Sequence, residues 1–162
     1  MKNHMPLKRH KAIVSFSKDH HYGLLLVWKI RQGLKNDIRP ERISNYAAYF
    51  FREDLEKHFR DEEQLLFSKL AATDTLRKRA EADHQAIYEL IAAIEQKKES
   101  GTLLNQLADA LEKHIRFEER ELFLHLQNNI SAADMELIEN RFSNNGRAID
   151  EKWEDVFWEL KN

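Results

Sequence analysis

The chain contains no cysteine among its 162 residues. This absence excludes disulfide bonds, metal sites built on thiolates and catalytic cysteine nucleophiles. Glycine and proline are also scarce, with 4 and 2 copies respectively. So few helix-breaking residues favour long uninterrupted helices and argue against a turn-rich β protein.

Long apolar runs and an excess of one charge are missing as well. The longest apolar stretch, Gly23–Trp28, is far too short to cross a bilayer. The N-terminal residues are basic but lack the apolar core of a signal peptide. The formal net charge is -2, from 26 Lys and Arg against 28 Asp and Glu. The chain therefore lacks the excess of positive charge that is typical of proteins that bind a phosphate backbone. We therefore expect a soluble, cytoplasmic protein that binds neither membranes nor nucleic acids.

Apolar residues recur at steps of three and four through most of the chain, which is the helical period. Four long helices are predicted, over about 6–34, 40–70, 75–98 and 102–128, with Gly101 closing the third. Because the connections are short, successive helices should run antiparallel. The predicted fold class is all-α: an up-down-up-down four-helix bundle with an extra C-terminal helix.

The whole chain, 1–162, is predicted to be a single domain, because domains of about 100–200 residues are common. The bundle should occupy about 8–129, followed by a helical extension over 131–162. Within the extension we expect a short helix capped by Ser131 and an amphipathic helix over 147–161.

A thirteen-residue segment occurs twice, as LEKHFRDEEQLLF at 55–67 and LEKHIRFEERELF at 111–123, with nine identical positions. In both copies a histidine and a glutamate stand one helical turn apart on the apolar face. These pairs are His58 with Glu62 and His114 with Glu118. A buried carboxylate is costly unless it is paired or coordinated. A metal ion held by the imidazole and the carboxylate would compensate for that cost.

The other two long helices each carry one histidine among apolar residues, His20 and His84. His20 is preferred over His21 because Phe16 and Leu24 flank it at four-residue steps. Together the chain offers four histidines and two glutamates, which suit two metal ions with shared carboxylates better than one ion. Nitrogen and oxygen ligands without sulfur indicate iron, with manganese or zinc as substitutes.

Each inward glutamate is followed by a second one, Glu63 or Glu119. The sequence favours a solvated position for both. The alternative is that they hold the imidazole of a ligand histidine in one tautomer.

The pattern H…HxxxE…H…HxxxE/D resembles the hemerythrin family, also called HHE cation-binding domains. The matching stretches are SKDHHYGLL, EKHFRDEEQLLF, ADHQAIYEL and EKHIRFEERELF, spread over about 13–127. The resemblance implies a non-heme di-iron site with an oxo or hydroxo bridge and two bridging carboxylates. The implied ligands are His20, His58, Glu62, His84, His114 and Glu118.

The chain departs from the oxygen-carrying members of that family at Tyr88, where they have a further histidine one turn after the third-helix histidine. They also end the last motif with aspartate, whereas this chain offers Glu118 or Glu119. The site is therefore one histidine short, which leaves an open position, a water or the Tyr88 hydroxyl near the metal. We expect a role in sensing, holding iron or protection rather than simple oxygen carriage.

The predicted small-molecule partner is dioxygen, nitric oxide or peroxide, and a homodimer is an option. A di-iron oxidase or peroxidase with the same ligands is the alternative function. A metal-free helical interaction module is less favoured. A ferritin-type site is disfavoured because Glu-x-x-His occurs once, at 81–84, instead of twice.

Overall fold

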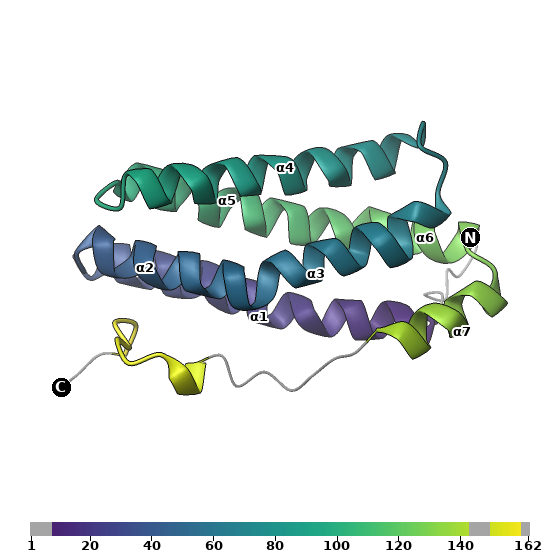
Figure 1. The fold of residues 1–162 in the computed structure, drawn as a ribbon, viewed down its shortest axis with the longest axis horizontal. Coiled ribbons are helices and arrows are strands. Elements are labelled where there is room, and N and C mark those ends of the chain that lie inside the picture. Colours follow the sequence, from purple (N-terminus) through teal and green to yellow (C-terminus); the bar gives the residue numbers. More distant parts are fainter. Residues whose placement is uncertain (1–7, 143–149, 160–162) are drawn as a thin grey trace, which may run out of the picture.

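The computed structural model describes residues 8–142 and 150–159, and within these ranges it contains helices and no strand. Four rods lie side by side and successive rods run in opposite directions (Figure 1). The first rod is α1 (Lys11–Lys35) and the third is α4 (Thr75–Gln96). The second rod joins α2 (Pro40–Phe50), η1 (Phe51–Leu55), α3 (Glu56–Asp61), η2 (Glu62–Leu66) and η3 (Phe67–Lys69). The fourth rod joins α5 (Gly101–Phe117), η4 (Glu118–Leu122) and α6 (Phe123–Asn129). The predicted all-α four-helix bundle is confirmed.

Local sequence signals set the helix ends. Asp74 caps α4 by accepting hydrogen bonds from the backbone N–H groups of Leu76 and Arg77. Pro40 begins α2, where its missing N–H costs nothing. The prediction that Gly101 closes the third helix is wrong. Instead Ser100 caps α5, and Gly101 is the first residue of that helix.

The extra C-terminal helix is α7 (Ala132–Arg141), which packs near the start of α1 (Figure 1). Its cap is Ser131, whose hydroxyl accepts from the backbone N–H of Asp134. Within the described part of this bundle, no helix is long and apolar enough to cross a membrane.

The amphipathic helix predicted over 147–161 is wrong for the described residues 150–159. Only one 3₁₀ turn, η5 (Asp150–Lys152), forms there, and residues 153–159 are irregular. Residues 147–149 and 160–161 lie outside the described part of the chain.

Tertiary contacts explain why this tail does not coil. Asp150 accepts a hydrogen bond from the buried Lys29 ammonium at 2.6 Å, and Asp155 pairs with Arg42. Trp158 covers the same ammonium at 4.0 Å, and Phe157 is buried in the core. Contacts spread along the tail therefore override its helical apolar pattern.

Two apolar clusters fill the bundle at its two ends. The tail-side core includes Ile30, Tyr46, Ile91, Leu104 and Phe157. The α7-side core includes Phe16, Phe67, Phe123, Met135 and Ile138. Between the two clusters along each rod, the interior becomes polar, and this layer holds the repeated histidines and glutamates.

The two copies of the repeated segment share an irregularity that the sequence pattern did not predict. A π-helical turn begins at Glu62 in the second rod and at Glu118 in the fourth. Such turns carry an additional residue and often occur at functional sites. A third π turn, η1, interrupts the second rod alone.

Candidate metal centre

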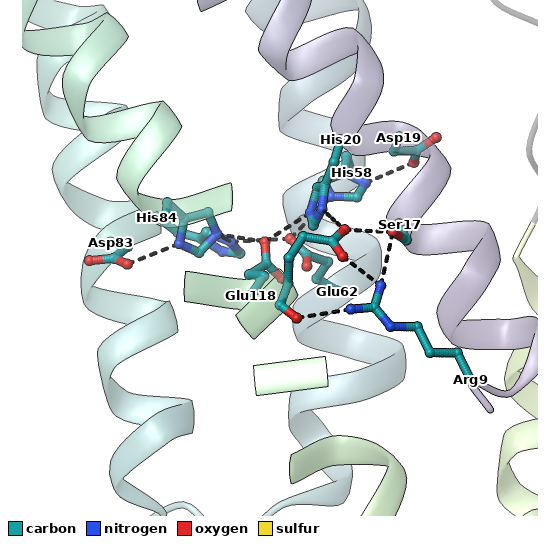
Figure 2. A network of polar contacts seen from close by, with 11 residues as sticks. Arg9, Ser17, Asp19, His20, His58, Glu62, Asp83, His84 and Glu118 are labelled. Carbon is teal, nitrogen blue, oxygen red and sulfur yellow. Dashed lines mark hydrogen bonds and ion pairs between the residues drawn. The ribbon is translucent and has the colours of Figure 1, made fainter. Parts of the chain in front are cut away.

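The six predicted ligand side chains converge in the polar layer between the apolar cores. They are all buried, and four of them have no exposed surface. Their inward atoms form two overlapping groups in which every atom lies within 4.8 Å of the others. The groups are His20, His58, Glu62, Glu118 and Glu62, His84, His114, Glu118. Both glutamates belong to both groups, so the geometry has two halves that share two carboxylates (Figure 2). His21, the alternative to His20, is exposed.

The spacing of the inward atoms suits coordination. The Nε2 atoms of His84 and His114 are 3.1 Å apart, and the Nε2 of His114 is 2.8 Å from Glu118. In the other half, the Nε2 of His58 is 3.3 Å from Glu62. Neighbouring ligand atoms that each lie about 2.1 Å from one ion are separated by roughly 3.0–3.4 Å. The residues present therefore fit a pair of metal ions without rearrangement of the backbone.

Each of the four imidazoles has its Nδ1 against a carboxylate from a different rod. The four pairs are His20–Glu119 at 2.6 Å, His58–Asp19 at 2.8 Å, His84–Glu63 at 2.8 Å and His114–Asp83 at 3.0 Å. A carboxylate at Nδ1 fixes the proton there, and it leaves the Nε2 lone pair directed at the centre. Such pairs are characteristic of metal-binding histidines because they orient the ring and raise its basicity.

Several of the inward atoms have no hydrogen-bond partner among the described residues. These buried atoms are the Nε2 of His20 and His58 and both carboxylate oxygens of Glu62 and Glu118. Buried polar atoms are nearly always satisfied, so unpartnered acceptors gathered at one point require a cation or protons. This observation is what distinguishes the layer from an ordinary buried hydrogen-bond network.

In the metal-free protein, protons take the place of the cation. Burial alone would lower the pKa of His20, but the nearby carboxylates of Glu118 and Glu119 outweigh it and raise that pKa to about 9. Burial is likewise outweighed at His114, where the charge of Glu118 and the contact with Asp83 raise the pKa to about 10. The pKa values of His58 and His84 are raised by the same balance.

The carboxylates respond in the opposite direction. Burial would raise the pKa of Glu118, but the charge of the facing His114 and the nearby His20 hold it well below its ordinary value. Burial is also outweighed at Glu119, where His20, Ser17 and Arg9 lower the pKa to about 2. The centre is therefore strongly anionic whenever its imidazoles are neutral, which favours a multivalent cation.

One half of the centre has an additional layer of contacts, drawn in Figure 2. Arg9 donates to Glu119 through Nη1, and through Nη2 to the backbone oxygen of the same residue at 2.9 Å. Ser17 also donates its hydroxyl to Glu119, at 2.5 Å. The carboxylate that positions His20 is thus itself held by two donors.

Residues 12–126 match the family model of the hemerythrin HHE cation-binding domain. The chain belongs to this family. The match includes all six inward histidines and glutamates, and it ends before α7. Comparisons with curated proteins and with solved structures gave no match. Membership makes this hemerythrin HHE domain a cation-binding helical bundle, and its His and Glu clusters are groups that could hold the cation.

Tyr88 occupies α4 one turn after His84 and is half-buried in this hemerythrin HHE domain. Its ring meets Phe51 at 5.4 Å and Phe59 at 5.9 Å, both edge-on, and Phe59 is stacked on His84 at 4.0 Å. Burial, followed by the charges of Glu63 and other glutamates, raises its pKa to about 12. Tyr88 therefore stays protonated at neutral pH, and its predicted contact with a metal stays a prediction.

The residues that the sequence pattern left out are the carboxylates behind the histidines. Glu63 and Glu119, for which solvent was favoured, are partly exposed, yet each contacts a histidine Nδ1, as the alternative proposed. Asp19 and Asp83 were not predicted at all. A signal for them exists, because the dipeptide Asp-His stands at 19–20 and again at 83–84.

Proposed function

We propose that the chain binds two iron ions in the polar layer, with His20, His58, Glu62, His84, His114 and Glu118 as ligands. The observation that carries this proposal is the set of buried unpartnered atoms between four imidazoles whose Nδ1 atoms already contact carboxylates. Manganese or zinc could occupy the same ligands, since both accept nitrogen and oxygen donors. Dioxygen, nitric oxide or peroxide is the proposed small ligand, and sensing, iron holding or protection the proposed role.

Iron would supply reversible one-electron chemistry, and the protein would supply the environment for it. The four Nδ1 contacts hold the imidazole rings in orientation, and Glu62 and Glu118 link the two halves. The apolar cores on both sides keep bulk water away from the layer. The cytoplasmic location and the single-domain organisation remain predictions from the sequence.

Metal analysis after reconstitution with iron in air tests the proposal. We expect two iron ions per chain and a near-UV charge-transfer band typical of a bridged iron pair. Chelation should lower the melting temperature, because a metal that binds only the folded state stabilises it by mass action. Fewer than one ion per chain without such a band would contradict the proposal. An unchanged melting temperature after chelation would favour the metal-free interaction module.

A di-iron oxidase or peroxidase is the second candidate, and the position of Tyr88 is the observation that favours it. Through Phe59 the tyrosine ring is one aromatic contact away from His84, a separation across which an electron can be transferred. Peroxide turnover that falls sharply in Tyr88→Phe would support this candidate. Equal turnover in the variant would remove the tyrosine from the reaction.

A further inference from the structure

The segment that precedes α1 is fastened to α6 by the side chain of Gln127. The Gln127 amide donates to the backbone oxygen of Lys8 at 2.9 Å and accepts from the backbone N–H of His10 at 2.8 Å. Both neighbours of Arg9 are therefore fixed to the same side chain. We call residues 8–10 the N-terminal strap.

The strap directs Arg9 toward the outer side of the metal centre. Its guanidinium makes the two contacts with Glu119 described above, and lies 5.8 Å from the ring of Phe123. Phe123 in turn stacks on His20, with 5.2 Å between ring centroids and 2° between planes. Arg9 thus acts on His20 by two routes, one through a carboxylate and one through an aromatic ring.

Among the described residues, the other half of the centre has only part of this arrangement. Arg79 lies 4.0 Å from the centroid of the Phe117 ring, and that ring is 6.5 Å from His114. Arg79 pairs with Glu121, however, and not with a carboxylate that contacts a histidine Nδ1. Alignment of His20 with His84 places Thr73 at the position of Arg9 and Glu81 at the position of Ser17. Glu63, which holds His84, makes no hydrogen bond to a second donor among the described residues.

Solvent also reaches the two halves unequally. The side chain of Asp19, which holds His58, is 2% exposed, whereas that of Asp83, which holds His114, is 34% exposed. Hydrogen bonds screened by water orient a ring less firmly than buried ones.

We infer that Arg9, acting through Glu119, makes the His20–His58 half the position that retains its metal ion and leaves the His84–His114 half as the position that exchanges. The inference rests on the two-metal centre proposed above. Arg9 is a positioning residue in this scheme, since it touches neither metal nor ligand. Removal of a contact behind a ligand imidazole typically lowers metal affinity 10–100-fold, and release should speed up accordingly.

Release of iron to a chelator measures the two positions separately. The full chain, loaded with two iron(II) ions without oxygen, is mixed with excess coloured iron(II) chelator, and the absorbance of the chelate is followed. We expect two phases of about one ion each. Arg9→Gln should accelerate the slow phase by up to about tenfold, the low end of the effect of losing a carboxylate that contacts the imidazole itself, and leave the fast phase unchanged. Glu63→Gln should accelerate the fast phase alone.

Three further variants separate orientation from charge. Arg9→Lys keeps the charge but lacks the two-pronged contact, so the slow phase should fall between the native and Arg9→Gln rates. Arg120→Gln removes an exposed charge beside Glu119 in the sequence and should change neither phase. Gln127→Ala frees the strap without altering Arg9 and should accelerate the slow phase.

Single-phase release from the native protein, or equal acceleration of both phases by Arg9→Gln, would overturn the inference while the two-metal centre stands. A native chain that does not bind two ions would instead contradict the proposed function, and the inference would fall with it. A melting curve of metal-free Arg9→Gln that matches the native curve establishes that the variant folds.

Discussion

The two halves of the candidate metal centre take the same kinds of residues from equivalent helices, but they differ in the residues that surround these. Each half takes a histidine from an Asp-His pair, on α1 or α4, and a His-x-x-x-Glu-Glu segment that ends in a π turn. A phenylalanine follows the segment in both copies and stacks on a histidine of the other half. Phe67 stacks on His84, and Phe123 stacks on His20.

The differences lie outside the repeated plan. Arg9 and Ser17 secure one half, whereas the equivalent positions of the other half carry Thr73 and Glu81. Phe59 lies on His84, whereas the equivalent residue of the second copy is Ile115. Two equivalent groups of candidate ligands thus differ in the contacts behind them, although the candidate ligands themselves are of the same kinds.

Loss of a shared carboxylate should have the largest effect, because Glu62 belongs to both halves. We expect Glu62→Gln to bind less than one iron ion per chain after desalting, as measured by metal analysis. Glu63→Gln is the matched control, since Glu63 is the next residue and, in the described part of the chain, hydrogen-bonds to a histidine of one half, His84. The control should keep one ion firmly and lose the second 10–100-fold more readily. Two ions retained in Glu62→Gln would refute the shared role.

The pH dependence of the stability of the metal-free protein compares one histidine of each half, His20 and His114. The pKa of His20 is raised from 6.5 to about 9, so protonated His20 stabilises the fold fully below about pH 6.5. That contribution, about 3 kcal/mol at 1.36 kcal/mol per pKa unit, is lost as the pH rises through about 9. His114, with a pKa of about 10, should lose its proton later.

Urea unfolding between pH 6 and 10.5, with imidazole signals followed by NMR, checks both expectations. Iron-loaded protein provides the control, because bound imidazoles are already deprotonated and the metal holds the fold at high pH. Metal-free protein whose stability does not fall between pH 6.5 and 10 would show that the histidines are neutral in the folded state.

Sequence periodicity predicted the four rods well, because each rod buries one apolar stripe and the connections are short. It also indicated the inward histidines and glutamates, since charged groups on an apolar stripe stand out. The partners of those histidines were harder to predict. Asp19 lies beside His20 in sequence but contacts His58 on another rod, and such a choice depends on how the rods pack.

Residues 150–159 also show that a local sequence pattern does not determine tertiary contacts. Their apolar spacing is helical, but Asp150 and Trp158 contact Lys29 and set the path of the chain. The π turns at Glu62 and Glu118 likewise leave no trace in the pattern of apolar residues. Arg9 could not be assigned from the sequence, because its role depends on the contacts that Gln127 makes with its two neighbours.

The smallest expected effect concerns Gly23, which stands three residues after His20 where the other half has Ile87 after His84. A Cβ at Gly23 would lie 2.8 Å from Cδ1 of Ile115. That atom ends a flexible side chain, so the contact can be relieved by rotation, while alanine in a helix gains about 1 kcal/mol over glycine. We expect Gly23→Ala to change the free energy of unfolding by less than about 1 kcal/mol. In Ile115→Val, which lacks Cδ1, the same substitution should stabilise the protein by about 0.5–1 kcal/mol, and urea unfolding of the double-mutant cycle measures the difference. If Gly23→Ala were equally destabilising in both backgrounds, the glycine would be required by something other than the close approach of Ile115.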